Sequence, residues 1–176
     1  MKRSTALLAL LLPLSVNAYA VSGEGYLGVF GGSMLADGLE TNQADPRIVT
    51  LGRKLNSRVA VQLEYSDAES FRTRVSDSSG VETPCAAEYK STAAYVVLTQ
   101  PAGRLIDFSF KLGYVDIDYD FDKSLTREQR ERYNDQSQSF GGGLTIKISK
   151  DMVLKTEYTQ LKDDVYYLTA GVELAL

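Results

Sequence analysis

The segment Phe140-Gly-Gly-Gly-Leu-Thr-Ile-Lys-Ile148, the turn Ser149-Lys-Asp151 and the segment Met152-Val-Leu-Lys-Thr-Glu-Tyr-Thr159 decide the fold class of this chain. In each segment, alternate residues differ in polarity. One face of the first carries Gly141, Gly143, Thr145 and Lys147, and the other carries Phe140, Leu144, Ile146 and Ile148. A period of two indicates β-strands with one apolar face. Because a three-residue turn joins them, the two segments predict an antiparallel hairpin.

The same alternation, broken by turn residues, recurs along the chain and predicts eight strands. They are expected at Gly25–Gly32, Ile48–Leu55, Arg58–Ser66, Tyr89–Gln100, Arg104–Phe121, Phe140–Ile148, Met152–Thr159 and Tyr166–Leu176. Only Tyr95-Val-Val-Leu98 is apolar on both faces, which leaves the orientation of its strand open.

The connections between these strands differ in length at the two ends of the sheet. Asn56-Ser57, Pro101–Gly103 and Ser149–Asp151 are short, whereas Ser33–Asp45, Asp67–Glu88 and Asp122–Gln138 are long, although Lys162–Asp164 is short again. Short turns at one end and longer loops at the other are typical of outer-membrane barrels. We therefore predict an all-β fold, a closed eight-stranded antiparallel up-and-down transmembrane β-barrel, with both termini at the short-turn end.

The polar face of the strands favours a membrane barrel over a soluble one. It combines several glycines with charges of both signs: Glu64, Lys111, Lys147, Lys155, Glu157 and Glu173. A narrow lumen accommodates small residues and paired charges, whereas a solvated outer face needs no glycine. Tyrosines near strand ends, Tyr65, Tyr114, Tyr158 and Tyr166, fit an interfacial girdle. We expect the six charges to form an ionic plug rather than a gate or a proton path, because unpaired buried charge is costly.

The N-terminus reads as a secretory signal peptide over residues 1–20. Lys2 and Arg3 precede an apolar run, and Ala18-Tyr-Ala20 gives the small-x-small pattern that signal peptidase requires. The run is too short for a membrane-spanning helix. The expected organisation is a cleaved signal peptide at 1–20 and one barrel domain at 21–176.

Composition excludes several function classes. The 176 residues contain no histidine, so a Ser-His-Asp triad and a His-ligated metal site are excluded. The net charge is −4 and no cluster of Lys or Arg is present, which argues against binding nucleic acid. Cys85 is the sole cysteine and is expected as a loop thiol. We expect no cofactor and no metal.

The chain resembles the OmpA-like, opacity-type family of small outer-membrane β-barrel domains. The resemblance rests on Gly25-Tyr-Leu-Gly-Val-Phe-Gly-Gly32, Phe140-Gly-Gly-Gly-Leu144, Leu154-Lys-Thr-Glu-Tyr158 and the closing strand from Tyr167 to Leu176. It implies a location in a Gram-negative outer membrane, no enzymatic activity, and a role in envelope integrity, adhesion or serum resistance. It also implies contact with outer-membrane lipids and lipopolysaccharide, and with the barrel-assembly machinery through the last strand. Family members usually end in an aromatic residue, whereas this chain ends in Leu176.

Two further groups of charges invite a functional interpretation. An acidic row, Asp116, Asp118, Asp120 and Asp122, shares the face that carries Phe110 and Leu112. Carboxylates cannot face lipid, so we interpret the row as a solvated extracellular rim beyond the bilayer, in preference to a Ca²⁺ site. The segment Ser124–Arg132 has the residues of a short helix, and we interpret its arginines, Arg127, Arg130 and Arg132, as solvated rather than anion-binding.

These observations predict a non-enzymatic outer-membrane protein with a structural or surface-interaction role, its loops free to contact a host or surface ligand. The alternatives are a small channel and a soluble periplasmic lipocalin-like carrier. A lipid A-modifying barrel enzyme is disfavoured because the known types use histidine.

Overall fold

The computed structural model describes residues 24–36, 44–76, 82–121, 135–163 and 165–176. They form one closed barrel in which each strand pairs antiparallel with the next and β8 pairs with β1. The strands are β1 (Gly25–Ala36), β2 (Pro46–Lys54), β3 (Val59–Ser76), β4 (Glu82–Pro101), β5 (Ile106–Phe121), β6 (Asp135–Lys147), β7 (Met152–Lys162) and β8 (Val165–Ala175). This confirms the predicted fold class. The expected signal peptide, Asp122 and the segment Ser124–Arg132 lie outside the described residues.

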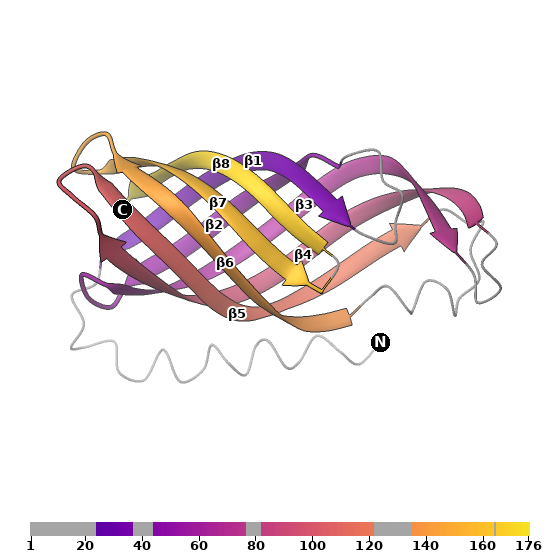
Figure 1. Ribbon diagram of the computed structural model, residues 1–176, viewed down its shortest axis with the longest axis horizontal. Helices are drawn as coiled ribbons and strands as arrows, with labels where there is room; N and C mark the ends of the chain where they lie inside the picture. Colours follow the sequence, from indigo (N-terminus) through magenta and orange to yellow (C-terminus); the bar gives the residue numbers. More distant parts are fainter. Residues whose placement is uncertain (1–23, 37–43, 77–81, 122–134, 164) are drawn as a thin grey trace.

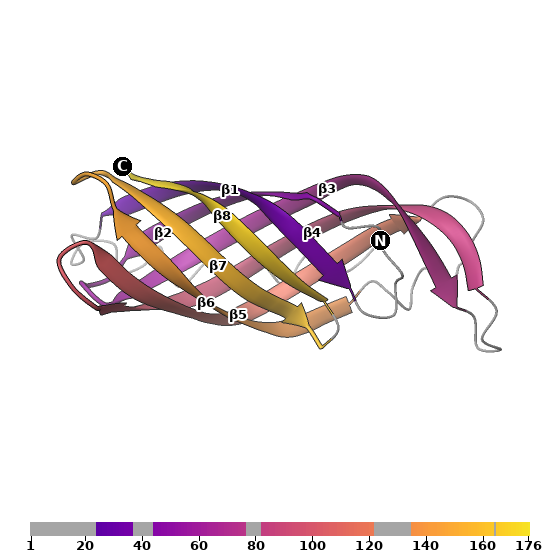
Figure 2. The same ribbon diagram turned by 45° about the horizontal axis from the view of Figure 1, so that its top comes forward.

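The strands are steeply tilted around a long barrel (Figure 1). The three tight turns that follow β2, β4 and β6 lie at one end, where β1 begins and the chain terminates; a second view shows the same arrangement (Figure 2). None of the described residues forms a helix that is long and apolar enough to cross a membrane.

Strands β3 and β4 rise beyond the rest of the barrel at the opposite end (Figures 1 and 2). Their pairing continues to Ser76↔Glu82, past a register shift between Ala68 and Phe71. The pairing of β2 with β3 stops at Pro46↔Ala68, and that of β4 with β5 stops at Ala87↔Phe121. We call this two-stranded projection, residues 71–76 with 82–86, the β3–β4 arm.

The arm corrects the expectation that Asp67–Glu88 is a long loop, because only residues 77–81 of that range lie outside the two strands. It also corrects the placement of Cys85, whose side chain is buried on β4 rather than in a loop. The prediction failed because the segment is rich in polar residues and contains Pro84, a residue depleted in strands, so its composition favours a loop.

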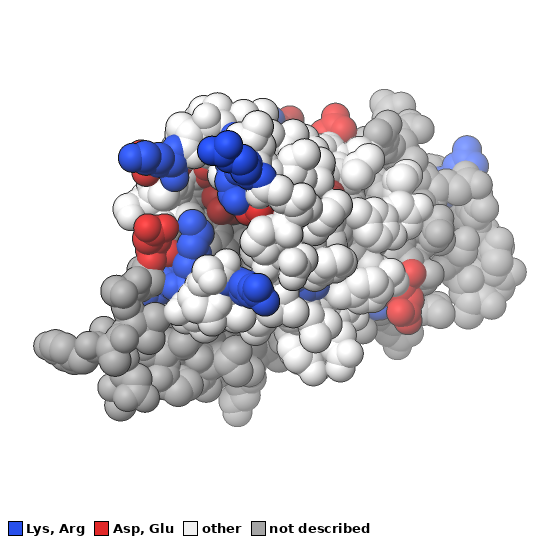
Figure 3. Space-filling model, turned by 60° about the vertical axis from the view of Figure 1, so that its left-hand side comes forward, with Lys and Arg blue, Asp and Glu red and all other residues white. Residues whose placement is uncertain are grey.

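A belt of apolar side chains encircles the outside of the barrel nearer the short turns. Exposed members include Val29, Leu51, Leu98, Phe108, Phe110, Leu112, Phe140, Ile146, Leu154, Leu168 and Leu174. Figure 3, which brings the short-turn end forward, shows charged side chains around that end, a largely uncharged wall behind them, and further charges towards the other end. Such a surface suits lipid and confirms the predicted outward orientation of the apolar face.

The polarity of the wall reverses partway along β5. From Ile106 to Tyr114 the outward residues are apolar, whereas Asp118 and Asp120 face outward and Ile117, Tyr119 and Phe121 are buried inside. The apolar part rises roughly 20 Å at about 3.3 Å per residue and a tilt of about 40°, somewhat less than the roughly 25 Å apolar band of membrane barrels. Tyr114 marks the boundary, as expected for the girdle.

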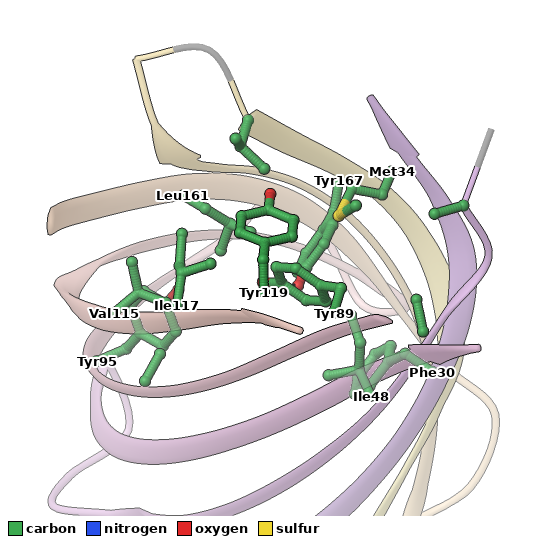
Figure 4. Close-up of a cluster of buried hydrophobic side chains, with 14 of the residues drawn as sticks. Phe30, Met34, Ile48, Tyr89, Tyr95, Val115, Ile117, Tyr119, Leu161 and Tyr167 are labelled. Atoms are coloured by element: carbon green, nitrogen blue, oxygen red, sulfur yellow. The ribbon is translucent and has the colours of Figure 1, made fainter. Parts of the chain in front are cut away.

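Beyond that boundary, apolar side chains pack in the barrel interior, as they do in the core of a soluble protein. A buried apolar cluster fills it, and the labelled side chains of Met34, Tyr89, Ile117, Tyr119, Leu161 and Tyr167 converge there (Figure 4). The rings of Tyr89 and Tyr119 pack edge to face at 5.3 Å, and Tyr119 stacks on Phe121 at 5.8 Å. We call this group the aromatic core. The sequence pattern alone does not predict the aromatic core.

Candidate functional site: the closed barrel interior

Inward-facing glycines make room for the large polar side chains of the interior. A Cβ atom at Gly141 would lie 2.7 Å from the Tyr158 carbonyl oxygen and 3.1 Å from Lys111 Cε, and one at Gly143 would collide with the Thr156 carbonyl oxygen and lie 2.9 Å from Glu157 Cγ. At Gly52 a Cβ would collide with the ring of Tyr26. The β6 glycine run that helped to identify the fold is therefore also what lets charged side chains cross the lumen.

Lys111 lies at the centre of the interior. Its Nζ donates to Glu64 Oε2 at 2.8 Å and to Glu157 Oε2 at 3.2 Å. It also lies 4.7 Å from the centroid of the Tyr95 ring, within cation–π range. One ammonium group thus connects strands β3, β5 and β7 across the lumen.

The ion pairs continue from Glu157 towards the short-turn end. Lys155 Nζ lies 2.9 Å from Glu157 Oε1 and 3.7 Å from Glu173 Oε2. The result is an alternating chain, Glu64–Lys111–Glu157–Lys155–Glu173, which we call the ionic chain. Lys147 is separate from it and pairs at 2.8 Å with Asp107, an interior carboxylate missing from the predicted set of six charges.

Burial follows position along the lumen. The side chains of Glu64, Lys111, Glu157 and Lys155 are 2–5% exposed, whereas that of Glu173 is 15% and that of Lys147 is 40% exposed. Removing one partner of a buried ion pair leaves the other charge unpaired, which destabilises the folded state by about 3–5 kcal/mol. The interior is therefore filled and held together by mutual pairing of its charges.

A cluster of hydroxyl groups lies between the ionic chain and the aromatic core. Ser66 Oγ bonds to Ser91 Oγ at 2.9 Å and to the Tyr167 hydroxyl at 2.6 Å, and Tyr167 donates to the Tyr89 hydroxyl. Below it, Tyr95 bonds to Ser139 at 2.9 Å, and Tyr26 donates to Gln62 at 3.1 Å. Charged, hydroxyl and aromatic layers thus close the lumen in succession.

The described members of the acidic row, Asp116, Asp118 and Asp120, lie on the outer wall beyond the apolar belt. Asp116 is half-buried, and Asp118 and Asp120 are exposed. Asp118 is in register with Lys90 of β4, which is in turn in register with Asp67 of β3. Within the described part of the chain, no group of three or more His, Cys, Asp or Glu side chains is arranged to hold a metal ion.

Comparison with known proteins shows the fold. No family model matches the chain, and no curated protein matches it in sequence. Neisserial surface protein A (NspA) superposes with a TM-score of 0.58 at 11% identity, over 85% of this chain and 96% of that structure. OprG from Pseudomonas aeruginosa gives 0.56 at 11% identity, over 86% and 96%.

Ail, the attachment invasion locus protein of Yersinia pestis, was solved in complex with the heparin analogue sucrose octasulfate. Its structure gives a TM-score of 0.50 at 16% identity, over 88% of this chain and 97% of that one. At such identities the likeness is one of architecture, and it agrees with the membrane-facing belt and the closed sheet.

Proposed function

We propose that this chain is a non-enzymatic outer-membrane protein whose plugged barrel anchors a polar, projecting surface outside the cell. The observation that carries the proposal is the reversal of polarity along β5, with lipid-compatible residues up to Tyr114 and carboxylates beyond it. In this orientation the short-turn end is periplasmic, and the acidic row is an extracellular rim. Outer-membrane lipids would surround the belt, and lipopolysaccharide headgroups would surround the rim.

The β3–β4 arm is the element best placed to meet another molecule. It extends past every other described strand. Arg47 and Glu69 pair at its base, and Arg74 is exposed within the arm itself. Two structural neighbours are named as a surface protein and an attachment invasion locus protein. These names support a surface-interaction role for this chain, which rests here on the geometry of the arm.

The packing of the barrel interior argues against the alternative of a small channel. An open pore needs a continuous water path, but the charged side chains at mid-lumen are only 2–5% exposed, and an aromatic core lies above them. We expect the purified protein to be silent in planar lipid bilayers under conditions in which a porin conducts. Stable ohmic conductance would replace the anchoring role with a channel.

The surface role is tested in cells that export the chain. Fractionation and a heat-modifiability gel first establish that it is folded in the outer membrane. Bacteria that display the wild type are then compared with bacteria that display a variant in which residues 72–86 are replaced by Asn-Gly, a two-residue hairpin turn. We expect arm removal to reduce adhesion to heparin-coated plates or epithelial monolayers without changing the gel shift. Equal adhesion of the two strains would contradict a contact role for the arm.

A further inference from the structure

The exposed charges of the described barrel differ in sign between its two ends. At the short-turn end the exposed cations are Arg53, Lys54, Arg58, Arg104 and Lys150, and the exposed carboxylates are only Glu24 and Asp151. Beyond the apolar belt the exposed cations are Arg47, Arg74 and Lys90, and the exposed carboxylates are Asp45, Glu69, Glu88, Asp118, Asp120 and Asp163. The short-turn end is therefore the basic end of the described wall, and Figure 3 shows Lys and Arg side chains around it.

Each of the three short turns carries one exposed cation that has no ion pair among the described residues. Arg58 lies between β2 and β3, Arg104 between β4 and β5, and Lys150 between β6 and β7. Lys54, by contrast, pairs with Glu24 at 3.4 Å. The three turns occupy three of the four positions around this end of the eight-stranded barrel, and the meeting of β8 with β1 occupies the fourth. We call Arg58, Arg104 and Lys150 the basic ring.

An exposed aliphatic side chain accompanies the cation on each of these turns. Leu55 is 41%, Leu105 is 62% and Ile148 is 50% exposed. Long basic side chains place their charged heads in the polar layer while their aliphatic stems lie along apolar groups. The same combination on three turns around one mouth fits a bilayer interface, where headgroups adjoin acyl chains. A soluble acidic partner would require the cations but not the exposed aliphatic groups.

We propose that the basic ring binds the headgroups of anionic phospholipids and so enriches these lipids around the short-turn end of the barrel. Arg and Lys donate charge-assisted hydrogen bonds to phosphate oxygens. Basic residues at a membrane surface also attract lipids of net negative charge in preference to zwitterionic ones. The inference rests on the membrane location proposed above, and in that orientation the bound lipids belong to the periplasmic leaflet.

The lipid preference is measured by electron spin resonance of spin-labelled lipids. The protein is refolded into phosphatidylcholine vesicles that contain a trace of spin-labelled phosphatidylglycerol or of spin-labelled phosphatidylcholine, and the fractions of label immobilised at the protein surface are compared. One Lys or Arg at an anionic surface contributes a preference of roughly fivefold. Because only part of the boundary lipid touches the turns, we expect the wild type to favour phosphatidylglycerol by about twofold to fivefold. High salt should reduce this preference by screening the charges.

Two triple variants with the same change in net charge locate the effect. The ring variant, Arg58→Gln with Arg104→Gln and Lys150→Gln, should bind both labelled lipids about equally. The control variant, Arg47→Gln with Arg74→Gln and Lys90→Gln, loses three exposed cations beyond the belt and should keep the wild-type preference. Circular dichroism and heat-modifiable gel mobility show whether each variant has folded. If the ring variant does not fold, the three single substitutions replace it, and each should remove part of the preference.

Equal immobilisation of the two lipids by the wild type would overturn the inference, as would an equal loss of preference in the ring and control variants. A wild type without lipid preference that sediments with peptidoglycan, when the ring variant does not, would assign the basic ring to the cell wall and refute lipid binding. Insertion into vesicles without a lipid preference would refute the basic ring alone. Failure of the wild type to insert at all would contradict the proposed membrane barrel as well.

Discussion

Lys111 Nζ lies 2.8 Å from Glu64 Oε2 in the middle of the barrel, and both side chains are almost completely buried. Glu157 lies on the other side of the same ammonium group. This arrangement makes the interior interdependent, because one lysine compensates carboxylates from two other strands.

Replacing Lys111 by Met should destabilise the folded barrel by about 3–5 kcal/mol, because two buried carboxylates lose their shared partner. The measurement is urea unfolding in lipid vesicles, followed by circular dichroism. Adding Glu64→Gln should recover part of the loss, because Glu64 is then neutral while Glu157 still pairs with Lys155. A Lys111→Met barrel as stable as the wild type would mean that these side chains do not pair inside.

Across the apolar belt, the loss of stability caused by an arginine substitution should depend steeply on its position along β5. Phe110, 59% exposed at the middle of the apolar part of β5, faces lipid, whereas Asp118 on the same face of β5 lies beyond it. Phe110→Arg should therefore cost about 2–4 kcal/mol in vesicles, and Asp118→Arg only about 0–1 kcal/mol. Equal costs would show that the bilayer does not end near Tyr114.

Adding a methyl group should change stability differently at a glycine that faces the lumen and at a glycine that faces outward. At Gly113 a Cβ would meet the Ala94 carbonyl and lie 2.8 Å from Tyr95 Cδ1, whereas at Gly31 it would meet nothing within 4 Å. Gly113→Ala should cost about 1–3 kcal/mol, as overpacking does. Gly31→Ala should be neutral or slightly stabilising. Comparable unfolding midpoints for the two variants would contradict the packing described for Tyr95.

The strand segments nearer the short turns are predictable, because each of them has one apolar side that faces lipid. The faces assigned to Phe140–Ile148 and Met152–Thr159 agree with the structure, and Tyr95 and Val97 turn out to face inward where the sequence left the orientation open. Asp118 and Asp120 lie on the outer face beyond Tyr114, and the interpretation of the acidic row as an extracellular rim stays a prediction.

The rest depended on contacts that a one-dimensional pattern does not show. The β3–β4 arm lies in a segment whose polar composition and Pro84 favour a loop, so the sequence pattern does not predict its strands. Asp107 could be placed on the polar face, but its pairing with Lys147 depends on the register of β5 with β6. The aromatic core joins residues from distant strands, such as Tyr89 and Tyr167, whose rings lie 6.0 Å apart.

The proposed orientation places the short turns in the periplasm, the apolar belt in lipid and the acidic row at the cell surface. It is tested most directly by single cysteines in a Cys85→Ala background, at Lys150 in a short turn, Leu112 in the belt and Asp118 in the acidic row. Cells exporting each variant are treated with a membrane-impermeant maleimide before and after permeabilisation of the outer membrane.

We expect labelling of Asp118→Cys in intact cells, labelling of Lys150→Cys only after permeabilisation, and little labelling of Leu112→Cys in either case. Rapid labelling of Leu112→Cys, or labelling of Lys150→Cys in intact cells, would contradict it.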